Sequence, residues 1–246
     1  MIVPRTSRKQ SESGYYHIIL RGVNRQEIFH DDADRAKFLE TLRRYTDDGI
    51  DVLAYCLMDN HVHLLLCAEA ELSMFIKKIA SSYVYYFNHK YDRIGHLFQD
   101  RYKSEAVDTD EYLLVAARYI LQNPQKAGIC QTKDYQWNSW NEIVTGIGLC
   151  NAQLLCDMIG SRQALMDFLL APANDNCLDV SEHATIKDEE ASRILCRISD
   201  MDNPGSIAEM DLEERRTCLA QAKREGVTIR QIARLTGIDR NFIQRA

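Results

Sequence analysis

The chain has 246 residues, of which 46% are hydrophobic and 27% charged, and its formal net charge is −6. This is the balance of an ordinary soluble protein with one large domain or two smaller ones. No apolar run approaches the roughly 20 residues that span a bilayer, and the N-terminus lacks the apolar core of a signal peptide, which excludes an integral membrane protein and predicts a cytoplasmic location.

Charge and cysteine are both distributed unevenly. Residues 171–214 hold twelve acidic and three basic side chains, whereas residues 215–246 hold eight basic and two acidic ones. A basic C-terminal segment behind an acidic connector is compatible with DNA binding at that end, and hence with a nucleoid-associated protein. The eight cysteines form no Cys-x-x-Cys pair, and several lie in apolar runs, which predicts reduced, packed thiols.

Residues 1–150 alternate between strand and helix patterns. β-Branched and aromatic runs predict strands, and apolar residues at helical spacing predict helices, the last of them ending at Pro124. The predicted strands are 15–24, 50–58, 61–68 and 101–107, and the helices are 31–47, 72–91 and 110–122. The order β-α-β-β-α-β-α predicts an α+β domain of the ferredoxin-like plan, with helices covering one face of the sheet.

The rest of the chain has helical patterns only. We expect a helical extension and linker at 151–183, and a helical C-terminal domain at 184–246. Within it, residues 226–245 read as a helix-turn-helix, in which Gly237 makes the turn and Asp239 caps the second helix. Outward polar side chains of such a motif reach base edges in the major groove. The candidates are Arg230, Arg240, Asn241, Gln244 and Arg245. The alternative is a small helical bundle that binds protein.

His61-Val62-His63 lies within the third predicted strand. Residues i and i+2 of a strand project from one face, so the two imidazoles point the same way, while Val62, Leu64 and Leu66 are buried on the other side. Two imidazoles on a rigid strand supply two of the three protein ligands that a metal site needs. The alternative is a pair of partly exposed histidines without a ligand role.

Four segments together resemble the single-tyrosine HUH transposases, and most closely the REP-associated tyrosine transposases. They are 58–66 (MDNHVHLLL), 95–104 (GHLFQDRYKS), 111–113 (EYL) and 118–128 (RYILQNPQKAG). The resemblance covers about residues 15–140, and the C-terminal segment resembles a replication-initiator-type helix-turn-helix. Members of this family cut single-stranded DNA next to a hairpin through a 5′-phosphotyrosine link, with Mg²⁺ or Mn²⁺ at the scissile phosphate.

The resemblance implies a role for each of several residues. It selects Tyr119, among twelve tyrosines, as the nucleophile, and His61, His63 and Asn123 as metal ligands. Tyr119 and Asn123 are four residues apart on one helical face, and an amide oxygen suits Mg²⁺ or Mn²⁺. The alternatives are a tyrosine packed on the sheet and an asparagine that caps the helix before Pro124.

The resemblance also implies a DNA-binding surface around this site. Its candidates, which would contact phosphates and be sensitive to salt, are Arg21, Arg25, His96, Arg101 and Lys103. The expected partners are single-stranded and hairpin DNA, with duplex DNA at the C-terminal module, and the expected state is a monomer or a homodimer. Two other functions stay open. One is a non-catalytic DNA-binding regulator, and the other is a zinc hydrolase, for which an acidic third ligand and a His-Glu-x-x-His helix are missing.

Overall fold

The computed structural model describes residues 10–46, 49–68, 71–99, 101–173, 175, 177–178, 188–227 and 229–245. The chain forms two compact units, Met1–Val180 and Ser181–Ala246. Within the described residues, no helix is both long enough and apolar enough to cross a membrane.

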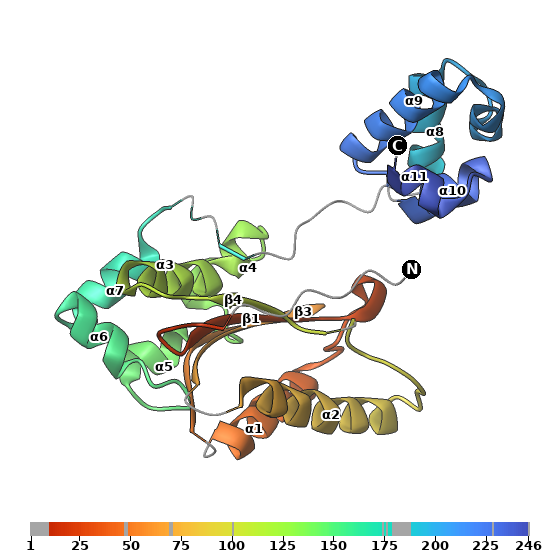
Figure 1. Ribbon diagram of the computed structural model, residues 1–246. Coiled ribbons are helices and arrows are strands. Elements are labelled where there is room, and N and C mark those ends of the chain that lie inside the picture. The colour runs from red at the N-terminus through yellow and green to blue at the C-terminus, as the bar shows by residue number, and fades with distance from the viewer. Residues whose placement is uncertain are drawn as a thin grey trace. The chain divides into compact units, whose positions relative to one another are not determined.

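The first unit is built on an antiparallel sheet of four strands in the order β2-β3-β1-β4 (Figure 1). The strands are β1 (Tyr15–Arg21), β2 (Ile50–Met58), β3 (His61–Ala68) and β4 (Lys103–Ala106). The main helices are α1 (Asp32–Tyr45), α2 (Leu72–Lys90) and α3 (Asp110–Leu121), and a short 3₁₀ turn, η1 (Val23–Arg25), follows β1. This confirms the predicted order β-α-β-β-α-β-α and the α+β class.

Helices cover both faces of the sheet, so the prediction that they cover one face is wrong. α1 and α2 pack on one face against Ile18, Leu64 and neighbouring residues, and α3 packs on the other against Ala54 and Leu65 (Figure 1). The sequence carries the reason, because β2 and β3 read as nearly continuous apolar runs, and strands of that kind are buried on both faces. The face under α3 is the one that carries the paired imidazoles.

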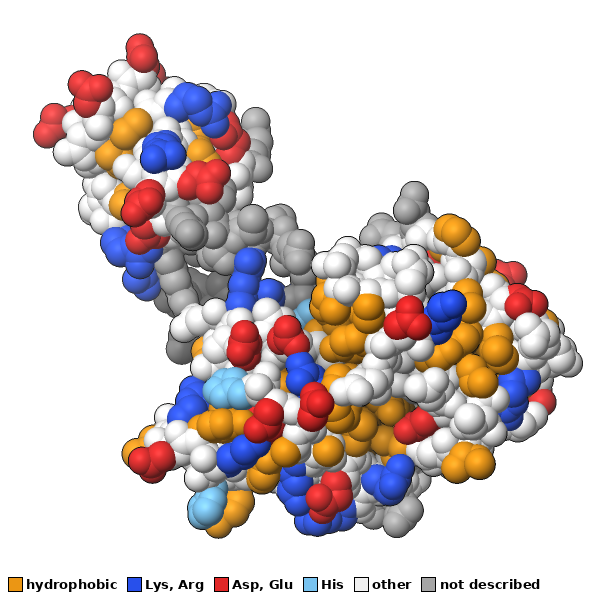
Figure 2. Space-filling model, turned by 180° about the vertical axis from the view of Figure 1, so that it is seen from behind, with side chains coloured by type: hydrophobic (Ala, Val, Ile, Leu, Met, Phe, Trp, Pro, Cys, Tyr) orange, Lys and Arg blue, Asp and Glu red, His pale blue; other side chains and the backbone are white. Residues whose placement is uncertain are grey.

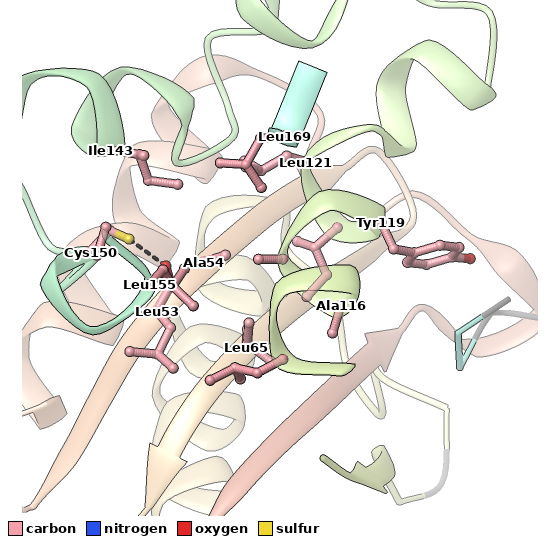
Figure 3. Packing of buried hydrophobic residues seen from close by; sticks show 14 of the residues in the cluster. Leu53, Ala54, Leu65, Ala116, Tyr119, Leu121, Ile143, Cys150, Leu155 and Leu169 are labelled. Carbon is pink, nitrogen blue, oxygen red and sulfur yellow. Dashed lines mark hydrogen bonds between the residues drawn. The ribbon is translucent and has the colours of Figure 1, made fainter. Parts of the chain in front are cut away.

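Further short helices pack behind α3. They are α4 (Asn123–Lys126), α5 (Trp140–Thr145), α6 (Gln153–Ile159) and α7 (Arg162–Leu170), with a 3₁₀ turn, η3 (Thr132–Asp134), between α4 and α5. The predicted helical stretch 151–170 is divided at Gly160, whose φ of +96° ends α6. Figure 3 shows apolar side chains from α3, α5, α6, α7 and the strands meeting in one cluster, where the Cys150 thiol donates to the Leu53 carbonyl at 2.7 Å. All eight cysteines are free thiols, as predicted.

The sequence predicts that helical structure stops at Pro124, but the chain forms another helical turn there. α3 ends at Leu121, but Pro124 lies in the first turn of α4. Proline is tolerated there because its missing N–H would have no partner in the first turn of a helix. The chain therefore makes another helical turn after Gln122, which brings Lys126 back towards α3.

The second unit is a helical bundle. Its elements are α8 (Asp188–Ser199), η4 (Pro204–Glu209), α9 (Leu212–Arg224), α10 (Ile229–Thr236) and α11 (Arg240–Arg245). Buried side chains such as Leu195, Leu219, Ile232 and Ile243 form its core. The turn between α10 and α11 contains Gly237 at φ +73°, and the Asp239 carboxylate accepts from the first amides of α11, which matches the local conformation that the sequence predicts.

Candidate active site

The face of the sheet beneath α3 carries three imidazoles. His61 and His63 project together from β3, with ring centroids 4.9 Å apart. β1 adds His17, whose Nε2 lies 2.9 Å from His63 Nδ1. The side chains of His17 and His63 are completely buried, whereas His61 is partly exposed. The alternation of β3 thus produces the arrangement that the His-x-His motif predicts, and the neighbouring strand supplies a histidine that the motif did not include.

Tyr119 projects from α3 towards these imidazoles. The centroid of its ring lies 6.0 Å from those of both His17 and His63. Tyr119 is a buried member of the apolar cluster that includes Ala116 and Leu121, and Figure 3 shows its ring at the edge of that cluster, with the hydroxyl at the far end. The chain thus brings together the tyrosine and the strand histidines that the sequence analysis selected.

The surroundings of His61 and His63 favour Nε2 as the ring nitrogen that carries the lone pair. His61 Nδ1 lies 2.6 Å from Asn60 Oδ1, and because an amide oxygen only accepts, Nδ1 is the protonated nitrogen. His63 Nε2 is buried and has no hydrogen-bond partner among the described residues. Burial, together with His61, His17 and Lys126, holds the pKa of His63 well below its ordinary value, so this imidazole is neutral. A neutral imidazole with an unused lone pair is what a metal ion requires.

The third ligand implied by the resemblance is turned towards its own helix. Asn123 Nδ2 donates to the Tyr119 carbonyl at 3.0 Å and approaches the Ile120 carbonyl at 3.4 Å. Among the described residues, no three His, Cys, Asp or Glu side chains are grouped so that they could hold a metal ion. The donation from Nδ2 leaves Oδ1 as the end of the Asn123 side chain that is not engaged with these carbonyls. The ligand role of Asn123 stays a prediction.

Two charged residues beside the site were not selected from the sequence. Lys126, on α4, has its ammonium nitrogen 4.0 Å from the centre of the Tyr119 ring. Glu105, on β4, lies opposite His17 in the strand register, with its carboxylate 3.9 Å from His17 Nδ1. The carboxylate also accepts from the Leu178 amide at 2.9 Å. The nearby His17, followed by hydrogen bonds from Tyr112 and the Leu178 amide, lowers the pKa of Glu105 and outweighs its partial burial, so Glu105 is ionised at neutral pH.

The predicted DNA contacts of the first unit fall into two groups. Arg21 lies directly opposite His61 in the register, and Lys103 lies opposite Ile19, which in turn lies opposite His63, so both belong to the imidazole face. The others lie outside the strands, Arg25 in η1 and His96 and Arg101 at exposed positions before β4. The pairing of Gly22 with Phe98 joins the segment that contains His96 to the end of β1.

In the second unit, Arg230 belongs to α10, and the other residues expected to contact bases belong to α11. Arg240, Asn241 and Gln244 are exposed, while Ile243 faces the core. The side chains of Arg230 and Arg245 lie outside the described residues. On the face seen in Figure 2, Lys and Arg side chains are interspersed with Asp and Glu over both units.

Comparisons with known proteins find similarity to transposases. Residues 10–123 match the model of a family described as IS200-like transposases. A solved structure of a REP-associated tyrosine transposase bound to a REP hairpin has the same fold, with a TM-score of 0.53 and 14% identity over 74% of this chain and 98% of that one. A putative transposase from Deinococcus radiodurans R1 is 18% identical over 51% of this chain and 92% of that one, with a TM-score of 0.34.

No curated protein shows significant similarity to the chain. The family match covers the sheet, both strand histidines, the Tyr119 helix and Asn123. Residues 10–123 of this chain thus match the IS200-like transposase family.

Proposed function

We propose that the protein nicks and rejoins single-stranded DNA beside a hairpin or repeat, through a 5′-phosphotyrosine intermediate on Tyr119. The observation that carries this proposal is the Tyr119 ring 6.0 Å from His63, whose Nε2 is buried and has no hydrogen-bond partner among the described residues. A nucleophile next to an unused ligand atom is typical of an active site, because a buried polar atom without a partner is costly in a site that only packs.

The nucleophilic step exchanges one phosphoester bond for another. The Tyr119 oxygen attacks phosphorus, the bond from phosphorus to the 3′-oxygen breaks, and the hydroxyl proton of the tyrosine is lost to solvent. The departing 3′-oxygen takes up a proton, so the products are a 3′-hydroxyl and a 5′-phosphotyrosine. Rejoining is the reverse attack by a 3′-hydroxyl. Lys126 is suited to stabilise the phenolate, because its ammonium lies 4.0 Å from the centre of the Tyr119 ring.

The residues present fit a divalent cation. His61 and His63 would hold Mg²⁺ or Mn²⁺ through Nε2, with Asn123 Oδ1 as the third ligand. The ion would polarise the scissile phosphate. Arg21 and Lys103 share this face of the sheet and would bind the flanking phosphates, so binding is expected to weaken with salt.

A covalent adduct tests the proposal. Purified protein is incubated with Mn²⁺ and labelled single-stranded DNA from the regions that flank its coding gene, and the products are separated on a denaturing gel. The wild type should give a labelled protein band, and Tyr119→Phe should abolish it while DNA binding persists. Tyr85→Phe is the matched control, because Tyr85 is 76% exposed on α2, which packs on the opposite face of the sheet, and should react like the wild type.

Two results would overturn the proposal. An adduct at wild-type yield in Tyr119→Phe would assign the nucleophile elsewhere. Hairpin binding without any nicked product, in either Mg²⁺ or Mn²⁺, would leave a DNA-binding regulator on a transposase scaffold. EDTA added before the DNA should prevent adduct formation, while binding of the protein to the DNA phosphates should persist.

A further inference from the structure

His17 is the buried residue of the site to which neither the resemblance nor the proposed chemistry gives a role. It is completely buried, and it lies between a candidate metal ligand and a carboxylate. Its Nε2 is 2.9 Å from His63 Nδ1, and its Nδ1 is 3.9 Å from Glu105 Oε2. The strand register produces this row, because Glu105 lies directly opposite His17 and His63 lies on the diagonal.

With His17 neutral, one arrangement of protons suits all three groups. The Glu105 carboxylate only accepts, and His17 Nδ1 faces it at 3.9 Å, so the proton of His17 is favoured on Nδ1. His17 Nε2 is then an acceptor, and His63 must donate to it from Nδ1. This leaves the lone pair of His63 on Nε2, the nitrogen that is buried and has no hydrogen-bond partner among the described residues.

We infer that His17 and Glu105 are positioning residues that fix the tautomer and ring orientation of His63 for divalent-metal binding. The inference rests on the proposed metal site and extends it across the next two strands of the sheet, β1 and β4. Partners of this kind typically contribute about 10- to 100-fold to metal affinity. Two further hydrogen-bond donors hold the Glu105 carboxylate in place, the Tyr112 side chain and the Leu178 amide.

A simpler role for His17 is as a buried core residue, and the choice of variants separates the two. His17→Leu fills the space but removes the acceptor. His17→Gln places an amide oxygen near the position of Nε2 and keeps it. Tyr55→Phe is the stability control, because it loses a hydrogen bond of Tyr55 to Glu142 at 2.9 Å that lies away from the site.

The primary measurement is Mn²⁺ affinity by calorimetry on the full-length protein. We expect His17→Leu to weaken binding roughly 10- to 100-fold, Glu105→Gln to weaken it severalfold, and His17→Gln to recover most of the loss. Tyr55→Phe should bind like the wild type even if its melting temperature falls as far as that of His17→Leu. Wild-type affinity in His17→Leu would overturn the inference.

A second measurement needs no metal. Long-range ¹H–¹⁵N correlation spectra of histidine-labelled protein should show His63 with an unprotonated Nε2, and a mixture of tautomers in His17→Leu and Glu105→Gln. An unchanged tautomer in both variants would overturn the inference. If the wild type itself binds no Mn²⁺, the proposed function fails, while these spectra still decide whether His17 and Glu105 set the tautomer.

Discussion

The Lys126 ammonium lies 4.0 Å from the centre of the Tyr119 ring, although a proline and the end of a helix separate the two residues in the chain. A cation over the face of a phenol is attracted to the ring and stabilises the phenolate form more strongly. Lys126 is therefore suited to the chemistry assigned to Tyr119.

Replacing Lys126 should slow the reaction more than it weakens DNA binding. We expect Lys126→Met to lower the initial rate of adduct formation roughly 10- to 100-fold, because it removes a preorganised charge from the transition state. Lys126→Arg should retain much of the rate. Lys133→Met, which removes an exposed lysine of η3, is the control and should react at the wild-type rate. Equal rates for the Lys126→Met variant and this control would rule out the role.

Substitutions at Asn123 should separate the capping of α3 from metal binding. Its Nδ2 donates to the Tyr119 carbonyl, so Asn123→Ala and Asn123→Asp both remove a buried hydrogen bond and should each cost about 1–3 kcal/mol of stability, measured by denaturant unfolding without metal. A carboxylate is a good ligand for Mn²⁺, so Asn123→Asp should keep Mn²⁺ affinity while Asn123→Ala loses it. If both variants bound Mn²⁺ as the wild type does, Asn123 would only be a cap.

An ion cluster on the opposite face of the sheet should make stability depend on pH. The buried Asp34 carboxylate accepts from Lys90 at 2.7 Å, from Tyr91 at 2.7 Å and from the His30 amide at 2.8 Å. Burial raises the pKa of Asp34, but these hydrogen bonds outweigh it and leave the pKa lowered. A carboxylate whose pKa is lowered by folding stabilises the fold at pH values above its pKa in the unfolded chain, which is about 4. This contribution is lost as pH falls through the pKa of the folded state.

We therefore expect Lys90→Met to lower the free energy of unfolding by about 2 kcal/mol at pH 7, because the buried Asp34 carboxylate is left without its cation. The partial exposure of Lys90 keeps this loss below that of a fully buried pair. The difference from the wild type should begin to shrink below about pH 4 and should disappear only as pH falls through the lowered pKa of Asp34 in the wild-type fold. Thermal melts between pH 3 and 7 measure this. Arg44→Met, which breaks an exposed pair with Glu40, should cost less than about 1 kcal/mol and serves as the control.

The second unit should contribute affinity for duplex DNA without taking part in cleavage. Asn241→Ala or Gln244→Ala, on the exposed side of α11, should weaken duplex binding by about 1–3 kcal/mol each if the side chain reads a base edge. Adduct formation on a short single-stranded substrate should not change. Arg216→Ala, an exposed residue of α9 paired with Glu213, is the control. Unchanged duplex affinity in both α11 variants would favour a helical module that binds protein.

The sequence predicted what depends on local periodicity. The alternation around His61 and His63 gave both the strand and the face of the ligands, and the helical spacing from Asp110 onwards gave the Tyr119 helix. His17 could not be recognised in the same way, because a single histidine in a strand has no local pattern to mark it. Its role follows from the pairing of β1 with β3 and β4, which is a long-range property.

Lys126 was missed for a different reason. Pro124 was interpreted as the end of a helix, whereas it occupies the first turn of the next one, and only the residues after a proline distinguish these two positions. The clue in the sequence was that no turn-forming residue comes after Pro124 until Gly128. The covering of both faces of the sheet could also have been predicted from the continuous apolar runs of β2 and β3.

β3 is an interior strand, joined by backbone hydrogen bonds to β2 along one edge and to β1 along the other. A shift of one residue would break both ladders at once and turn the two imidazoles to the opposite side of the sheet. The spacing of the histidines is thus fixed by the backbone, whereas α3 is held over them mainly by side-chain packing. Adjustments of the candidate site in the course of evolution are therefore expected to arise from movement and substitution in the helix that carries Tyr119.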